Sequence, residues 1–404
     1  MEKIIFPVLE DLEEERKWCL DDAAEYWIYG YGRIGKETAE TLIKRKKHIK
    51  GIIDQKKSVD SVNGIPVMEA EKWDQYDSGI VLICTDVFYN EIKQKLIQKN
   101  IRTFAPYYSI YLGRELDYSE YNKVNRVLAQ IQYKQYVEKS SENNDVVLDG
   151  LDVVITEKCS LKCKECSNLM QYFSHPQNAD YEHIMNSLSK VLENVKYIRD
   201  INILGGEPFM NKEWHRYVLE IMKYKNIGNI LIHTNGTILP VEEELKKIDD
   251  KRVVFKLSNY GKVSVNLEGM IELLKKHEIC YTVAKVEEWV RCGDIYRHNR
   301  SETENRKVYD SCCMKGVLSL KDGMIFGCPF AGNAAALQAV PQEINEGVST
   351  TASDDILAGI RELQAKKYLK VCDYCEGRPI GFYDIPAAEQ TKEPRPYKQY
   401  VYEK

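Results

Sequence analysis

Two stretches of the chain alternate short apolar runs with segments that carry an apolar residue every three or four positions. In the first stretch, residues 26–29, 50–54 and 79–84 read as strands, and residues 36–47 and 90–100 read as helices with one buried face. Strands that alternate with helices in this way predict a βαβ-type parallel sheet.

A polar, helix-forming segment follows from residue 115 to about 140, and it predicts a helix that connects two folded regions. Beyond it the alternation resumes for five further steps in one direction. Such a series predicts a parallel sheet that curves into a full or partial barrel, whose chemistry would lie at the carboxyl ends of the strands. The expected strands are 152–156, 201–204, 229–233, 253–257 and 280–284, and the expected helices are 183–198, 212–224, 241–248 and 267–277.

Length and charge narrow the class of protein. The 404 residues suffice for two or three domains. Lys plus Arg number 57 against 62 Asp plus Glu, so no net basic field attracts nucleic acid or anionic lipid. The apolar runs are far shorter than the roughly 20 residues that cross a bilayer, and the acidic N-terminus is unlike a signal peptide. We therefore expect a cytoplasmic protein that binds neither nucleic acid nor a membrane.

The chain has 12 cysteines, and their clustering is the first sign of chemistry. In a reducing compartment, clustered cysteines bind metal or do redox chemistry more often than they form disulfides. Cys159, Cys163 and Cys166 fall in one loop directly after the first strand of the second sheet. Thiolates at this spacing can converge on one soft metal centre, either zinc or an iron–sulfur cluster. Both usually take four ligands, so a cubane cluster held by these three would keep one iron open.

Two further motifs stand at the ends of the next two strands, a Gly-Gly-Glu-Pro sequence at 205–208 and a Thr-Asn-Gly-Thr sequence at 234–237. Together with the CxxxCxxC spacing, they resemble the signatures of the radical S-adenosylmethionine (radical SAM) enzymes over residues 150 to 300. The resemblance implies a [4Fe–4S] cluster on the three cysteines and S-adenosylmethionine (SAM) on the open iron. It also implies the reaction, in which one-electron reduction cleaves SAM to methionine and a 5′-deoxyadenosyl radical that abstracts a substrate hydrogen atom.

The motifs also suggest which residues would contact SAM. Gly205 and Gly206 lack side chains and would let the backbone approach the methionyl part, and the Glu207 carboxylate would accept hydrogen bonds from its ammonium group. Asn235 is a further candidate for the cofactor site. Ser258, just past the fourth strand, is a candidate ribose contact, although a loop cap is an equal reading.

One position departs from the family pattern. Many members carry an aromatic residue directly before the third cysteine, where it helps to frame the adenine, but this chain has Glu165. Adenine packing would then come from backbone contacts or from Tyr172 or Phe173.

The C-terminal region carries a second, looser group of cysteines. Residues 316–328 read as a hairpin with an Asp-Gly turn, which would bring a cysteine before one strand close to a cysteine after its partner. The arrangement resembles the auxiliary-cluster module, of twitch or SPASM type, of some radical SAM enzymes. The resemblance implies a closed auxiliary [4Fe–4S] cluster, with zinc as the alternative occupant. The implied ligands are Cys313, or Cys312 in its place, with Cys328, Cys372 and Cys375.

A fully ligated auxiliary cluster would give structural support or accept an electron. A substrate radical at an alcohol carbon becomes a carbonyl when it loses a proton and an electron, and related enzymes with this module include dehydrogenases. A spare thiol, such as Cys280 or Cys292, could instead return a hydrogen atom, which an epimerase requires.

The first sheet carries its own motif. Gly30, Gly32 and Gly35 form a GxGxxG sequence between a strand and a helix, and Asp54 ends the second strand. This is the context in which such glycines bind a dinucleotide. The region resembles the small Rossmann-like domains found beside sugar-modifying enzymes, which implies a nucleotide or nucleotide-sugar; NAD and the absence of any ligand stay open.

The sequence thus predicts an α/β protein in four parts. These are an N-terminal Rossmann-like parallel sheet (1–114), a connecting helix (115–148), a radical SAM core with a partial (β/α)6 barrel (149–305), and a small twitch-like module with the C-terminal tail (306–404). We expect an oxidoreductase, of dehydrogenase or epimerase type, that acts on a carbohydrate-like or nucleotide-linked small molecule with a flavodoxin- or ferredoxin-type electron donor. The alternatives are a radical SAM maturase of a ribosomally made peptide and a noncatalytic zinc-binding scaffold with a nucleotide-sensing domain.

Overall fold

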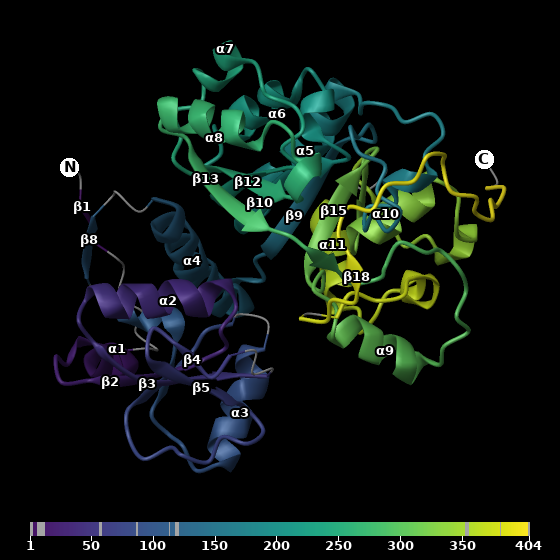
Figure 1. The fold of residues 1–404 in the computed structure, drawn as a ribbon. Helices are drawn as coiled ribbons and strands as arrows, with labels where there is room; N and C mark the ends of the chain where they lie inside the picture. Colours follow the sequence, from purple (N-terminus) through teal and green to yellow (C-terminus); the bar gives the residue numbers. More distant parts are fainter. Residues whose placement is uncertain are drawn as a thin grey trace. The chain divides into compact units, whose positions relative to one another are not determined.

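The chain forms two compact units, residues 1–127 and 128–404 (Figure 1). Both are of α/β type, as predicted. The division falls within helix α4 (Tyr121–Asn143), where the sequence predicts the connecting helix. No helix among the described residues is both long and apolar enough to cross a membrane. The computed structural model describes residues 3–5, 13–55, 59–85, 88–112, 114–117, 121–351, 355–379 and 381–402.

The first unit is built on a six-stranded sheet with the order β4-β5-β3-β2-β6-β7, in which only β4 runs antiparallel to its neighbour. Its elements are β1 (Lys3–Ile5), α1 (Glu13–Leu20), β2 (Glu25–Tyr29), α2 (Arg33–Lys44), β3 (His48–Asp54), β4 (Ser61–Val62), β5 (Ile65–Glu69), β6 (Ile80–Ile83), α3 (Tyr89–Gln98), β7 (Phe104–Pro106) and β8 (Glu115–Asp117). The three predicted strands form the centre of the sheet as β2, β3 and β6. From β2 the chain continues to β3 on one side and then to β6 on the other side. Open α/β sheets bind ligands at such a switch point in strand order.

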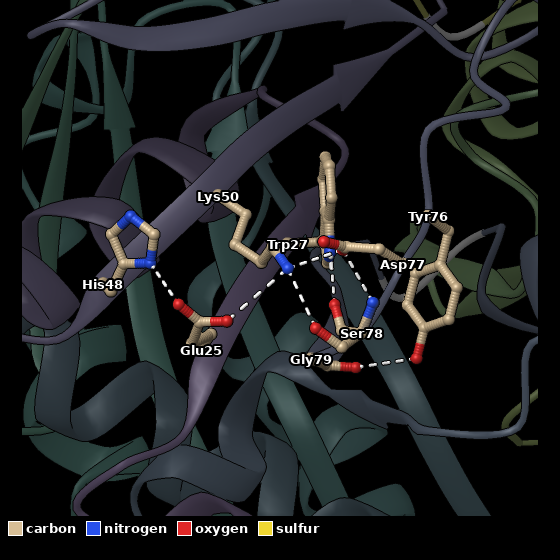
Figure 2. Close-up of polar contacts among 8 residues, drawn as sticks. All are labelled: Glu25, Trp27, His48, Lys50, Tyr76, Asp77, Ser78 and Gly79. Carbon is tan, nitrogen blue, oxygen red and sulfur yellow. Dashed lines mark hydrogen bonds and ion pairs between the residues drawn. The ribbon is translucent and has the colours of Figure 1, made fainter.

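A polar cluster joins the strands at the amino-terminal edge of this sheet (Figure 2). Lys50 Nζ lies 2.5 Å from Asp77 Oδ1 and 3.5 Å from Glu25 Oε2. The other Glu25 oxygen, Oε1, lies 2.7 Å from His48 Nδ1. Because Glu25 and His48 begin β2 and β3, this cluster is at the opposite end of the strands from the glycine-rich loop. It therefore ties strand ends together and is separate from the predicted nucleotide site.

The second unit is built on an eight-stranded sheet with the order β13-β12-β11-β10-β9-β15-β16-β17, and the six strands from β13 to β15 in this order are parallel. Its elements are β9 (Val147–Thr156), α5 (Tyr181–Asn194), β10 (Tyr197–Gly205), α6 (Trp214–Ile221), β11 (Ile227–Thr234), α7 (Glu242–Leu245), β12 (Val253–Asn259), α8 (Leu267–Lys276), β13 (Cys280–Lys285), β14 (Glu288–Trp289), α9 (Glu302–Asp310), β15 (Val317–Lys321), β16 (Met324–Phe326), α10 (Pro329–Ala336), β17 (Val348–Ser349), α11 (Ile356–Ala365) and β18 (Ile385–Pro386).

The five strands predicted for this unit are confirmed as β9 to β13. The predicted helix 183–198 is wrong at its end, because α5 stops at Asn194 and the next residues enter β10. The predicted hairpin is confirmed: β15 and β16 pair antiparallel around Asp322 and Gly323. Both turn residues have positive φ, 48° and 74°, as a two-residue hairpin turn requires.

The two faces of the second sheet differ in character. Helices α5, α6 and α8 lie along one face and bury an apolar core against it (Figure 1). Alternate residues point the other way, and three of them form a polar row across neighbouring strands. Asn202 Nδ2 donates to Asp152 Oδ1 at 2.8 Å, and Asn202 Oδ1 lies 2.9 Å from His233 Nε2. Ser319, in register with Asp152, is fully buried, and its hydroxyl has no hydrogen-bond partner in the described structure.

The first prediction concerns the pH dependence of stability. Burial raises the pKa of the Asp152 carboxyl to about 7, against the opposing hydrogen bond from Asn202. The native state therefore holds a proton that the unfolded state loses near pH 4, so this group makes the free energy of unfolding fall by about 2 kcal/mol between pH 5 and pH 7.

Asp152→Asn keeps the acceptor for Asn202 and does not titrate. Urea unfolding measured at pH 5 and at pH 7 gives the free energy of unfolding of each chain. Between these two pH values, that free energy should rise by about 2 kcal/mol in the variant relative to the natural chain. A difference between the two chains that is independent of pH would contradict this account.

Candidate active site

The loop after β9 holds the three clustered cysteines. Cys163 is 8% exposed, and Cys159 and Cys166 are partly buried. Burial raises the pKa of all three thiols, that of Cys163 to about 12, while backbone N–H groups of Asn168 and Met170 oppose this rise at Cys166. Buried thiols become thiolates when a metal centre supplies the compensating charge.

The Gly-Gly-Glu-Pro loop packs directly against this cysteine loop. A Cβ on Gly206 would lie 2.3 Å from Lys158 O and 2.8 Å from Cys159 Cβ. A Cβ on Gly205 would lie 2.0 Å from Thr156 O. The sequence predicts that these glycines admit the cofactor, and the structure shows that they also admit the cysteine loop itself.

The second prediction follows from this contact. Gly206→Ala is expected to displace the cysteine loop, because the new methyl group would overlap backbone atoms of Lys158 that cannot rotate away. We expect anaerobically reconstituted protein to lose most of the iron bound by this loop. The matched control is Gly269→Ala in α8, where a Cβ would meet only Leu239 side-chain atoms at 3.6 Å or more. Equal iron content in the two variants would contradict the prediction.

Three motifs at three strand ends meet around Glu207, which is fully buried. Its carboxylate accepts hydrogen bonds from Thr234 Oγ1 and from Asn235 N, both at 2.8 Å. Burial raises the pKa of Glu207 to about 7 against these hydrogen bonds. Asn235 Nδ2 in turn donates to Ser160 Oγ at 3.2 Å and lies 3.7 Å from Cys159 Sγ. The structure thus brings Glu207 and Asn235 together with the cysteine loop.

Ser258 lies near the end of β12, where its carbonyl accepts from Ser264 Oγ at 3.1 Å. The same Ser264 hydroxyl lies 2.7 Å from the Asn235 carbonyl, so the ends of β11 and β12 are joined there. Tyr260 follows, with its ring 5.4 Å from that of Trp289 and edge-on to it. The predicted ribose contact of Ser258 stays a prediction.

Glu165 contacts two segments that are distant in sequence. Its Oε2 accepts from Gly293 N at 3.1 Å, and its Oε1 lies 3.5 Å from Arg395 Nη1. Tyr172 OH donates to Gly293 O at 2.9 Å, and the Phe173 ring lies under the ammonium group of Lys321. Packing of Tyr172 or Phe173 against adenine stays a prediction.

The second cysteine group surrounds a cavity. This cavity is partly open to solvent. Cys313, the ligand first expected, does not line this cavity and is exposed, whereas its neighbour lines it. The structure therefore brings the predicted cysteines together, with Cys312 in the place of Cys313. The cysteines on the cavity are Cys312, Cys328, Cys372 and Cys375.

Polar groups around this cavity favour thiolates. Backbone N–H groups of Met314, Ala331 and Gly377 each face one of the sulfurs, those of Cys312, Cys328 and Cys375, at 3.3 to 3.4 Å. Cys328 also caps the amino terminus of α10, where the helix dipole stabilises negative charge. The donor set therefore fits a thiolate-ligated metal centre.

A buried cation completes this site. Arg378 lines the cavity, and its Nη2 donates to Ser167 O in the cysteine loop. Burial opposes its charge, but negative charge on the surrounding sulfurs of Cys292, Cys375 and Cys328 outweighs burial and raises the pKa of Arg378. Its Nε is buried without a hydrogen-bond partner in the described structure. Sequence reasoning missed Arg378, because no local pattern marks an arginine that is buried by distant segments.

No group of three or more His, Cys, Asp and Glu side chains among the described residues forms a recognisable single-ion site.

The glycine motif of the first unit is also formed. Gly30 adopts a positive φ of 96° in the turn after β2, and a Cβ on Gly35 would overlap the Gly30 carbonyl at 1.9 Å. A Cβ on Gly32 would meet no atom within 4 Å, so its surface is open. Asp54 Oδ2 accepts from Tyr31 N at 2.6 Å and so faces the glycine loop. The structure brings these four predicted residues together.

Comparison with known proteins places the second unit in a class. Residues 153–306 match the model of the Radical SAM superfamily. The chain therefore contains a radical SAM domain, and the cofactors of this family are a [4Fe–4S] cluster and SAM.

Curated relatives match the same region. GTP 3′,8-cyclase of Clostridium acetobutylicum is 28% identical over 140 residues, which are 32% of this chain and 44% of that protein. GTP 3′,8-cyclase of Helicobacter pylori is 24% identical over 151 residues, or 36% of this chain and 44% of that protein. The chain thus spans less than half the length of these relatives.

Solved structures that resemble part of this chain include BtrN in complex with AdoMet and 2-DOIA. The sequence identity is 18% and the TM-score is 0.38, and the match covers 62% of this chain and 98% of that one. Another is Streptococcus suis SuiB bound to S-adenosylmethionine, at 14% identity and a TM-score of 0.32, covering 67% and 75%. Both TM-scores are low, and the likeness carries no conclusion about function.

Proposed function

We propose that this radical SAM enzyme is an oxidoreductase with a second, auxiliary [4Fe–4S] cluster, and that it oxidises or epimerises a carbon of a carbohydrate-like or nucleotide-linked small molecule. The observation that carries the proposal is the cavity lined by four cysteines and Arg378. In our proposal the domains keep the boundaries expected from the sequence.

At the radical SAM site, Cys159, Cys163 and Cys166 would hold the cluster, which together with SAM supplies a radical able to abstract a hydrogen atom. Glu207 would accept a hydrogen bond from the SAM amino group. A carboxylate offers about four acceptor positions, and three are taken by Thr234 Oγ1 and by the N–H groups of Asn235 and Phe209. The carboxylate is therefore fixed in orientation and keeps acceptor capacity for the ligand.

At the second site, Cys312 takes the place first given to Cys313, with Cys328, Cys372 and Cys375 as the other ligands. Oxidation of an alcohol carbon to a carbonyl removes one hydrogen atom, one proton and one electron. A closed cluster beside a buried cation is suited to take that electron, because positive charge favours the reduced state. The buried Arg378 is the residue of this chain that provides the charge.

Two observations support the substrate class. The polar row of Asp152, Asn202 and His233 offers hydrogen-bonding groups of the kind that bind hydroxylated molecules. The curated relatives are named for a reaction of GTP, a nucleotide. Separately, the glycine loop and Asp54 of the first unit would bind a nucleotide or nucleotide-sugar, with NAD, or no ligand, as the alternatives.

The test is anaerobic incubation of reconstituted protein with SAM and reduced flavodoxin or dithionite. We expect 5′-deoxyadenosine, and about eight iron atoms per chain for two four-iron clusters. Nucleotide-sugars deuterated on the ring should transfer deuterium into 5′-deoxyadenosine. Transfer from a precursor peptide and from no sugar would favour a peptide maturase, and zinc without sulfide would favour a scaffold.

A further inference from the structure

The C-terminal segment from Ile385 to Tyr402, here called the strap, pairs with the cysteine loop. Lys164 N donates to Glu389 O and Thr391 N donates to Lys162 O, both at 2.7 Å. These two bonds form an antiparallel bridge between Cys163 and Gln390. A segment more than 220 residues away in sequence thus runs alongside the loop that carries the radical SAM cysteines.

The side chain of Gln390 is fully engaged in this pairing. Its Oε1 accepts from Lys162 N at 2.6 Å, and its Nε2 donates to Cys163 Sγ at 3.2 Å and to Ala388 O at 2.7 Å. The backbone N–H of Lys162 can only donate, which requires the amide oxygen to face it. The Nε2 hydrogens therefore face the sulfur and the carbonyl.

Contacts on both sides hold the strap in place. Its first residues form β18, which pairs with β14. Further along, Arg395 N donates to Gln171 O at 2.8 Å, and Arg395 Nη1 donates to Lys164 O at 3.1 Å. Arg395 also pairs with Asp294. Ala388 adopts a positive φ of 55°, an unfavourable conformation for a residue other than glycine that persists only where surrounding contacts impose it.

From this geometry we propose that Gln390 is a positioning residue of the radical SAM cluster, and that its amide N–H, held by the strap, stabilises negative charge on the Cys163 sulfur. The inference deepens the proposed function and rests on Cys163 being a cluster ligand. Hydrogen bonds to cluster sulfurs and other second-shell contacts tune the reduction potential. A donor favours the reduced cluster, which carries the additional electron.

The test uses full-length reconstituted enzyme with Gln390→Leu, which removes the donor, and Gln390→Glu, which also adds a negative charge. The matched control is Glu389→Gln, because Glu389 reaches the cysteine loop through its backbone carbonyl. The readout is the midpoint potential of the electron paramagnetic resonance signal that changes on addition of SAM.

We expect the midpoint potential to be more negative in Gln390→Leu than in the natural chain, and more negative again in Gln390→Glu. For Gln390→Glu the expected change is about tenfold in the one-electron equilibrium, or about 59 mV. Formation of 5′-deoxyadenosine should fall with a weak reductant and recover with a stronger one, whereas Glu389→Gln should match the natural chain.

Unchanged midpoints in both Gln390 variants would overturn the inference. Loss of the cluster from both would also overturn it, since Gln390 would then act only in folding. A natural chain without any SAM-responsive signal would instead refute the proposed function, so the two failures are distinguishable.

Discussion

The variant Cys163→Ala is expected to form no 5′-deoxyadenosine above the level of a protein-free reaction, and Cys159→Ala and Cys166→Ala are expected to behave in the same way. Each removes one of only three thiolates in the loop after β9, and no fourth cysteine lies close in sequence to replace it. Because SAM would be held on the cluster, losing the cluster removes both the electron source and the binding site. The measurement is chromatographic detection of 5′-deoxyadenosine after anaerobic incubation with SAM and reductant.

The control is Cys280→Ala, which removes a buried thiol at the start of β13. Its loss costs packing of one sulfur atom but no expected cluster ligand, so 5′-deoxyadenosine should still form. Product at the level of the natural chain in Cys163→Ala would contradict the assignment of this loop. Loss of 5′-deoxyadenosine in Cys280→Ala alone would give that thiol a role in SAM cleavage, beyond the hydrogen-atom return for which the sequence makes it a candidate.

Replacing Cys312 by serine is expected to lower the iron content from about eight to about four atoms per chain. Cys312 lines the cavity and receives an N–H hydrogen bond from Met314, so its sulfur is placed among the other three. The adjacent residue provides a matched comparison. Cys313→Ser is expected to keep about eight iron atoms, because this thiol is exposed and lies off the cavity.

Iron and sulfide analysis of the two serine variants, together with visible absorbance, decides the point. The reverse result, with iron lost in Cys313→Ser and kept in Cys312→Ser, would restore the ligand first expected from the sequence. Equal iron in both variants and the natural chain would remove the auxiliary cluster from the account. In either case the radical SAM site would be unaffected, since its cysteines belong to a different loop.

The sequence anticipates the fold well where strands are continuous apolar runs. The strand at 80–83 is fully buried and is mostly β-branched, and its place in the strand–helix alternation implies parallel neighbours. It fails where strands are short and polar, as in β4 and β17, because pairing across a sheet rather than local preference makes these strands. The predicted end of α5 is also wrong, since Val195 continues the apolar periodicity beyond the helix.

The candidate site divides in the same way. Local spacing identifies Cys159, Cys163 and Cys166, and Glu207 follows from its motif. The choice between Cys312 and Cys313 has no local signal, because adjacent residues differ only in which one the fold turns inward. Gln390 lies in a polar segment without periodicity, and only its long-range pairing with the cysteine loop reveals it.

The central claim is that Cys159, Cys163 and Cys166 would hold a [4Fe–4S] cluster with one open iron, to which SAM would bind through its amino group. The most direct measurement is electron–nuclear double resonance on the reduced protein with SAM labelled with ¹⁵N at the amino group. The account predicts a hyperfine coupling from the label to the cluster signal, and no such coupling in Cys163→Ala. A cluster signal in the natural chain that shows no coupling to the ¹⁵N label would contradict this claim.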